Sequence, residues 1–96
     1  MSLAIDYDGT FDTVTPFWRE VIKLAAAFDI QCWFVTCRSR DDFDDDEFDA
    51  LVEMTGLPRH RHLFTAGVAK QWYCEQRGIY INWWIDDDPA CVGSGK

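Results

Sequence analysis

The chain has 96 residues and a formal net charge of −8, with 48% hydrophobic and 16% aromatic residues. This length predicts one compact domain over residues 1–96, with enough apolar residues for a core and no room for a second domain. Nine basic against 17 acidic residues argue against extended nucleic-acid or anionic-membrane binding, because the net field repels polyanions. There is no signal-peptide pattern and no apolar run near the ~20 residues that span a bilayer, so we expect a soluble, cytoplasmic protein.

The first half of the chain predicts two strands around one helix. A short apolar strand over residues 3–5 runs into a polar loop over residues 6–10. Thr15 and Pro16 mark a helix start, with Thr as N-cap and Pro in the first helical position. Apolar residues then recur at helical spacing and predict a stripe that faces the core: Phe17, Val21, Leu24, Ala25 and Phe28. Residues 31–36 predict a second buried strand.

The second half repeats this alternation. An acidic run over residues 41–49 leads into a second helix, whose end is marked by Gly56 and Pro58. Three further elements follow from composition and periodicity: a strand at 62–65, a helix at 68–77 and a strand at 79–85. We expect residues 92–96 to form a flexible tail.

Alternating strands and helices of these lengths imply right-handed crossovers and a short parallel sheet of about four strands. The predicted fold class is therefore α/β, with a Rossmann-like sheet covered by helices on both faces in three layers. His60 and His62 lie in a basic loop and are expected to be exposed. The five tryptophans are expected mostly in the core, and their number leaves a homo-oligomer face as an alternative.

Polar residues gather where the predicted strands end. The residues at these positions are Asp6, Asp8, Thr36, Arg38, Asp86 and Asp87, and Lys70 begins the third helix. The carboxyl ends of parallel strands share one edge of the sheet, so these side chains are expected to converge. Grouped carboxylates repel one another unless a hard cation such as Mg²⁺ lies among them. A lysine and a hydroxyl beside such a site suit a phosphoryl group.

Together these motifs resemble the haloacid dehalogenase-like (HAD) hydrolase superfamily, over roughly residues 3–89. Residues 6–10 (DYDGT) match its first motif, Asp-x-Asp-x-Thr after a strand. Thr36 at a strand end, Lys70 near a helix start and the acidic pair at 86–87 match the other three motifs. The resemblance implies a minimal HAD core without a cap domain.

The resemblance also implies a magnesium-dependent phosphohydrolase that acts through an aspartyl-phosphate. Asp6 would be the nucleophile, and Asp8 the general acid and then the general base. Thr36 and Lys70 would bind phosphoryl oxygens. Arg38, two residues past Thr36, is a candidate clamp for the substrate phosphate.

The implied metal ligands are the Asp6 carboxylate, the Asp8 backbone carbonyl and Asp87, with Asp86 orienting Lys70 or a metal-bound water. Residues 10–16 are too few for the flap that follows the first motif in relatives, and no later stretch is long enough for a cap. An open site favours a bulky or exposed phosphorylated substrate, such as a protein side chain or a polynucleotide end, over a small molecule.

Two alternatives involve other classes of protein. The first is a HAD-like module that binds phosphate or a partner without hydrolysing it. The short flap favours this alternative, whereas the presence of both Asp6 and Asp8 argues against it, because binding alone does not need an acid and base at that spacing. Response-regulator receiver domains use similar groups, but their phosphoaccepting Asp precedes the Thr in mid-chain, which excludes them.

The acidic run raises the possibility of a calcium loop. Asp42, Asp44 and Asp46 fall at alternate ligand positions and Glu53 at the twelfth. Glu47 stands where the calcium loop needs Gly for its sharp turn. A solvated acidic face or a helix N-terminus is therefore favoured.

Overall fold

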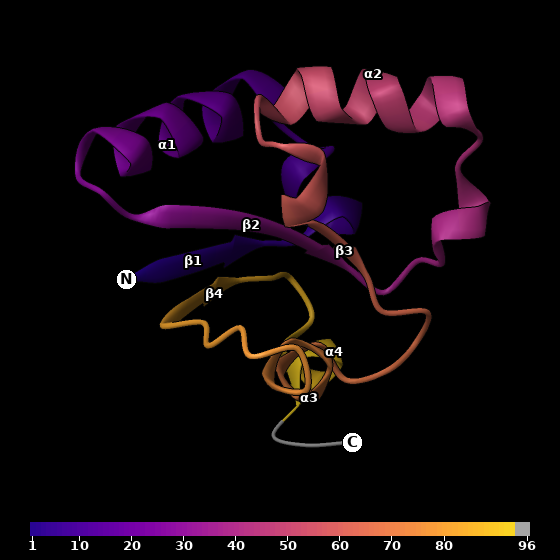
Figure 1. Cartoon of the computed structure of the whole chain (residues 1–96). Coiled ribbons are helices and arrows are strands. Elements are labelled where there is room, and N and C mark those ends of the chain that lie inside the picture. The colour runs from indigo at the N-terminus through magenta and orange to yellow at the C-terminus, as the bar shows by residue number, and fades with distance from the viewer. Residues whose placement is uncertain (94–96) are drawn as a thin grey trace.

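Four parallel strands form one sheet in the order β3-β2-β1-β4 (Figure 1). The computed structural model describes residues 1–93. The strand bounds are β1 Ser2–Ile5, β2 Gln31–Thr36, β3 His62–Phe64 and β4 Trp83–Ile85. The predicted α/β class and the four-stranded parallel sheet are confirmed.

Helices lie on both sides of this sheet. The helix bounds are α1 Thr15–Ala27, α2 Asp45–Thr55, α3 Lys70–Glu75 and α4 Pro89–Val92, and the short helical turns are η1 Tyr7–Phe11, η2 Arg40–Asp42 and η3 Arg59–Arg61. In Figure 1, α1 and α2 lie above the sheet and α3 and α4 below it. No helix within residues 1–93 is long and apolar enough to cross a membrane.

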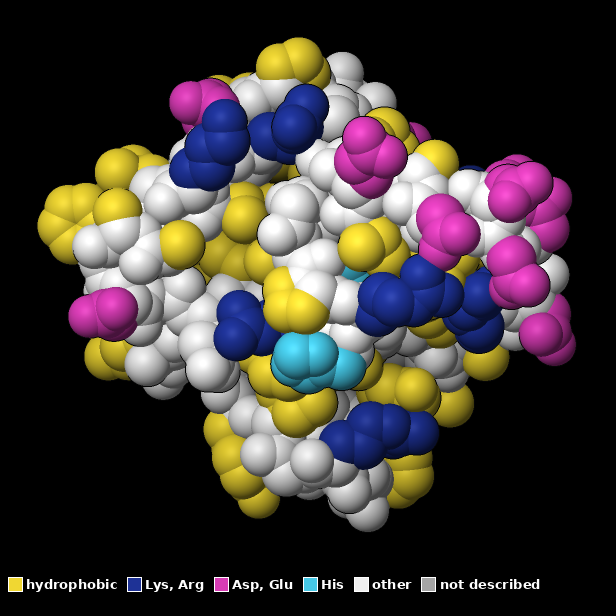
Figure 2. Space-filling model, turned by 45° about the horizontal axis from the view of Figure 1, so that its top comes forward, with side chains coloured by type: hydrophobic (Ala, Val, Ile, Leu, Met, Phe, Trp, Pro, Cys, Tyr) yellow, Lys and Arg dark blue, Asp and Glu magenta, His cyan; other side chains and the backbone are white. Residues whose placement is uncertain are grey.

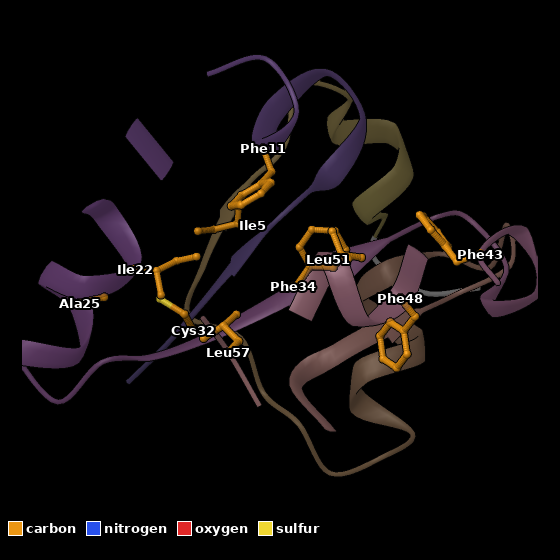
Figure 3. Packing of buried hydrophobic residues seen from close by; sticks show 10 residues of the cluster. All are labelled: Ile5, Phe11, Ile22, Ala25, Cys32, Phe34, Phe43, Phe48, Leu51 and Leu57. Atoms are coloured by element: carbon orange, nitrogen blue, oxygen red, sulfur yellow. The ribbon is translucent and has the colours of Figure 1, made fainter. Parts of the chain in front are cut away.

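The strands supply apolar side chains to both faces of the sheet, because neighbouring residues of a strand point to opposite sides. Ile5 and Phe34 belong to the larger core beneath α1 and α2, which Figure 3 shows from close by. Ala4 and Val35 belong to a smaller core on the other face, together with Cys74 of α3. Both faces are therefore covered, and polar side chains reach the sheet only at its ends.

Helix α1 buries a face that overlaps only partly with the predicted one. Phe17, Leu24 and Phe28 were expected in the core, but they are exposed, Phe28 by 71%. Ala25 is buried and Val21 packs against the core as predicted, and Ile22 is buried although it was not predicted. Apolar residues occur nearly all round this helix, so periodicity predicts its existence but does not fix which stripe meets the sheet.

Strand β4 is shorter than the predicted range of 79–85. Pairing with β1 begins where Trp83 meets Leu3. Asn82, the residue before β4, is held against the start of β1: its N–H donates to the Ser2 carbonyl at 2.9 Å, and its Oδ1 accepts from the Ser2 N–H at 2.8 Å. Strand β1 begins at Ser2 and therefore offers no partner for earlier residues.

Helix α3 also begins later than predicted. Ala66 and Gly67 have φ angles of 54° and 86° in the turn before it. Ala69, the N-cap, has a non-helical backbone with a ψ of 126°. The helix therefore starts at Lys70 rather than at residue 68.

Helix α4 was not predicted. Asp88 caps it by accepting a hydrogen bond from the Ala90 N–H at 3.2 Å, and Pro89 takes the first helical position. At residues 15–16 a similar pair begins α1, but Thr15 is not the predicted N-cap: Val14 is the N-cap, and the Thr15 hydroxyl donates to the Phe11 carbonyl at 3.0 Å. Val92 is therefore helical rather than part of a flexible tail, and residues 94–96 lie outside the described part of the chain.

The acidic run begins α2 and does not form a calcium loop. The Asp44 carboxylate accepts from the Glu47 N–H at 2.8 Å, and the Glu47 carboxylate accepts from the Asp44 N–H at 2.9 Å. Gly56, with a φ of 71°, ends the helix. Negative charge at a helix N-terminus is favourable, so the interpretation as a helix start is confirmed.

One expectation about burial was wrong. His62 is buried, and its Nδ1–H donates to the Pro58 carbonyl at 3.0 Å while its Nε2 accepts from the Thr55 hydroxyl at 2.8 Å. The tryptophans divide: Trp18, Trp33 and Trp84 pack partly buried against the two cores, as expected for most of them, and Trp72 and Trp83 are exposed. Burial of His62 thus depends on two hydrogen-bond partners that its basic surroundings in the sequence do not indicate.

Candidate active site

Asp6 and Asp86 lie side by side where the strand order reverses. The chain runs outward from β1 through β2 to β3, and then places β4 on the other side of β1. Asp6 follows β1 and donates its N–H to the Ile85 carbonyl at 2.9 Å, and Asp86 follows β4. The carboxyl ends of strands at such a reversal form the usual ligand crevice of an open α/β sheet.

Lys70 is buried between these two acids. Its side chain is only 1% exposed, and Nζ lies 2.6 Å from Asp6 Oδ1 and 2.5 Å from Asp86 Oδ2. Burial lowers the pKa of Lys70, but the hydrogen bonds to Asp6 and Asp86 outweigh burial and raise it. The ammonium group therefore stays charged and holds both carboxylates in place.

A third carboxylate completes an acidic cluster. Asp6, Asp86 and Asp87 each offer an oxygen within 4.8 Å of the others, and no second such cluster occurs within residues 1–93. Burial raises the pKa of Asp6 to about 6, Lys70 opposes this, and Asp86 and Asp87 add to it. Three acids around one lysine leave an excess of negative charge. Carboxylate oxygens are the ligands that Mg²⁺ takes, so this donor set fits a magnesium ion.

The turn η1 brings the backbone close to Asp87. Gly9 has a φ of 77°, and a Cβ at this position would lie 2.2 Å from Asp87 Oδ2. The turn is closed by the Phe11 N–H, which donates to the Asp6 carbonyl at 3.1 Å, and by the Gly9 N–H, which donates to Asp12 Oδ1 at 2.8 Å. Only glycine combines this backbone angle with such a close approach. The sequence motif contained Gly9, but its contact with Asp87 was not predicted.

Asp8 points to Arg38 rather than to the acidic cluster. The Arg38 Nε and Nη2 donate to the two Asp8 carboxylate oxygens at 2.8 and 2.6 Å. The Asp8 carboxylate is therefore not a member of the candidate metal site. Arg38, predicted as a phosphate clamp, has instead a carboxylate of its own chain as its bidentate partner.

Thr36 is fully buried at the end of β2. Its hydroxyl oxygen accepts a hydrogen bond from the Arg38 N–H at 3.2 Å. The Thr36 hydroxyl could still donate a hydrogen bond to a ligand, but Thr36 does not line the cavity above the acids. In this structure Thr36 fixes the backbone that leads to Arg38.

The cavity above the acids has a volume of about 180 Å³ and includes residues that sequence reasoning missed. Its lining consists of Asp6, Asp8, Cys37, Lys70, Asp86, Asp87, Asp88 and Cys91. A hydrogen bond from Cys91 Sγ to Asp88, 3.3 Å long, raises the pKa of the Cys91 thiol to about 12. Cys91 is therefore protonated and is not a nucleophile at neutral pH. No spacing of the cysteines indicated this position.

Comparisons with known proteins found no matching family model, no matching curated protein and no matching solved structure. Function is therefore inferred from the residues and geometry of the site itself.

Proposed function

We propose that the protein is a magnesium-dependent phosphohydrolase of the HAD-like type, acting through an aspartyl-phosphate. One observation carries the proposal. A buried aspartate at the end of the central strand shares a buried lysine with the acid that ends the neighbouring strand. A third carboxylate lies beside them. The strand order β3-β2-β1-β4 supports a Rossmann-like core with helices on both faces.

Asp6 is the proposed nucleophile. Lys70 binds its Oδ1, so Oδ2 is the oxygen for in-line attack on phosphorus. Attack forms the Asp6 O–P bond and breaks the bond from phosphorus to the leaving-group oxygen. A water then attacks the same phosphorus, and the Asp6 carboxylate leaves. Two displacements replace one difficult hydrolysis.

Asp8 is the proposed acid and base, and Arg38 decides when it is available. Both Asp8 oxygens accept hydrogen bonds from Arg38, so Asp8 has to lose at least one of them before it holds a proton. A substrate phosphate can also take both N–H donors of a guanidinium and would therefore compete with Asp8 for Arg38. Binding of the phosphate at Arg38 would therefore release Asp8 to protonate the leaving group.

Magnesium, when bound by Asp6, Asp86 and Asp87, would screen the repulsion between the carboxylates and the phosphate. Lys70 keeps Asp6 and Asp86 oriented for this set. Asp88 is a poorer ligand candidate than Asp87, because it lies outside the cluster of three acids and its carboxylate caps α4.

The proposed substrate carries its phosphate on a bulky or exposed group. Only residues 12–14 separate the turn η1 from α1, which is too short a stretch to close over a ligand. The cavity of about 180 Å³ is below the range of ~300–1,000 Å³ for sites that enclose a small molecule. Binding energy then has to come from contacts outside the cavity.

Hydrolysis of p-nitrophenyl phosphate with and without Mg²⁺ tests the activity. We expect magnesium-dependent turnover, and loss of turnover in Asp6→Asn because the amide keeps the shape but is not a nucleophile. Asp41→Asn, at an exposed acid of η2, is the control. Full activity of Asp6→Asn would exclude the mechanism. Phosphopeptides and 3′-phosphorylated oligonucleotides should then show higher kcat/KM than sugar phosphates.

A non-catalytic phosphate-binding module is the second candidate. The bidentate pair between Asp8 and Arg38 favours it, because this pair occupies the proposed acid. The two functions differ in turnover. Saturable binding of inorganic phosphate that Arg38→Gln abolishes, with no hydrolysis of any phosphomonoester by the wild-type protein, would establish the binding module.

A further inference from the structure

A second hollow, larger than the acidic cavity, lies between α1 and the segment over residues 55–61. Its volume is about 340 Å³, and it shares no lining residue with the acidic cavity. Figure 2 views the molecule from the side of α1 and α2 and shows this face hollowed, with apolar side chains at the bottom and basic side chains around it. Its volume falls within the range of small-molecule sites.

The floor of the hollow is apolar. Ile22, Cys32 and Leu57 form it, and all three are buried at the edge of the larger core. Thr55 also lines the hollow, but its hydroxyl is already engaged with His62 and with the Leu57 N–H. A polar group placed on this floor would find no partner, so the inner part of an occupant has to be apolar.

The rim of the hollow is cationic. Arg19 and Lys23 stand one helical turn apart on α1, and Arg61 stands in the opposite wall. Arg19 and Arg61 form no ion pair with any residue in the range 1–93, although the chain has 17 acidic residues. The Arg61 guanidinium carbon lies 5.9 Å from the centre of the Trp33 ring. Burial raises the pKa of the Cys32 thiol, and the positive charge of Arg61 opposes this.

We propose that this hollow binds a small amphiphilic carboxylate, a medium-chain fatty acid whose chain covers the floor and whose head group meets Arg19 and Arg61. At about 30 Å³ for each water-sized group, the volume holds on the order of ten non-hydrogen atoms, which corresponds to octanoate. The site is independent of the proposed phosphatase activity. Two guanidinium groups that form no ion pair with the described residues, of which Arg61 lies over the Trp33 ring, complement one anionic head group, and the apolar floor complements one apolar chain.

Calorimetric titration at pH 7, below micelle-forming concentrations, separates the contributions of chain and charge. Affinity should rise about fifteenfold from hexanoate to octanoate, because each buried CH₂ contributes about fourfold. Octanol should bind at least tenfold more weakly than octanoate, and octylammonium should not bind measurably. Equal affinities of octanoate and octylammonium would overturn the proposal.

Variants test the location of the site. Arg19→Gln and Arg61→Gln should each weaken octanoate binding at least fivefold, whereas Arg77→Gln, in the turn after α3, should have no effect. Ala26→Phe should fill the hollow and abolish binding, because Ala26 lines it. Ala27→Phe is the matched control, since Ala27 is exposed on the same helix outside the hollow. Octanoate binding that survives both Ala26→Phe and loss of the two arginines would refute the assignment.

Discussion

Lys70 is the residue that makes the acidic site compatible with burial. Replacing it by Met leaves the Asp6 and Asp86 carboxylates without their shared cation. We expect Lys70→Met to lower the free energy of unfolding by about 3 kcal/mol or more, as removal of one partner of a buried ion pair does. Lys23→Met is the matched control, because the pair of Lys23 with Glu20 is exposed and screened. Urea unfolding of both variants measures the difference, and equal effects would contradict it.

Gly9 is the second position where a single residue decides the site. Gly9→Ala would place a methyl group against Asp87 Oδ2, and the carboxylate would have to move away. We expect Mg²⁺ affinity to fall tenfold or more, as for other perturbed ligand environments. The cost of the positive φ, about 1–2 kcal/mol, should leave the chain folded.

Gly78→Ala separates backbone strain from displacement of Asp87. Gly78 has a φ of 72°, but nothing lies within 4 Å of its added Cβ. The two variants should therefore lose similar stability, and only Gly9→Ala should lose magnesium affinity. Equal magnesium affinities in the two variants would show that Gly9 does not position Asp87.

At the scale of elements, the buried His62, which joins the start of β3 to the end of α2, should make the stability of the protein depend on pH. Burial lowers the pKa of His62 below its ordinary value of 6.5. Below pH 6.5 the unfolded chain takes up a proton that native His62 resists, so stability falls as the pH falls. The slope is at most about 1.4 kcal/mol per pH unit for one group.

Protonation of Asp6 has the opposite effect on stability from protonation of His62. The contribution of His62 therefore has to be measured as the difference between the wild-type protein and a His62 variant. The native pKa of Asp6, about 6, lies above the unfolded value of 3.8, and its protonation therefore favours the native state as the pH falls through 6. Urea unfolding at pH 7 and pH 5 should show that His62→Gln removes part of the acid-induced loss of stability. His60→Gln, at an exposed histidine, should leave that loss unchanged.

The sequence predicted most elements that have strong local signals, α4 excepted, and it missed features that depend on contacts. The end of helix α2 at Gly56 was predicted, whereas its start at Asp45 within the acidic run was not specified. The predicted face of α1 was only partly right, because only packing selects among its several apolar stripes. Strand β4 was predicted too long, because its length is set by where β1 begins, about 80 residues earlier in the chain.

The candidate site shows the same division. Asp6, Lys70, Asp86 and Asp87 do come together, as expected for residues at the carboxyl ends of parallel strands. The pairing of Asp8 with Arg38 was not predicted, because side-chain direction at a loop is not encoded by spacing. Cys91 lies in α4, and because α4 was not predicted, the position of Cys91 in the lining of the acidic cavity was not predicted either.

For the whole molecule, magnesium should raise the melting temperature, because a ligand that binds only the native state stabilises it by mass action. At a hundred times its Kd the gain is about 2.7 kcal/mol, which corresponds to on the order of 10 °C or more for a domain of this size. Asp87→Asn should abolish the shift, and Asp88→Asn should retain it because Asp88 caps α4. Sodium chloride at the same ionic strength controls for general screening, and an equal shift with that salt would exclude a specific site.

The pairing of β1 with β4 also ties the site to a late step of folding. Asp6 and Asp86 lie 80 positions apart in the sequence. Closing a loop of this length has a high entropic cost, so the β1 and β4 contact is expected to form late. Partly folded chains then hold the acids apart and have no cluster for a divalent cation. In refolding experiments, magnesium binding should therefore appear at the same time as the pairing of β4 with β1.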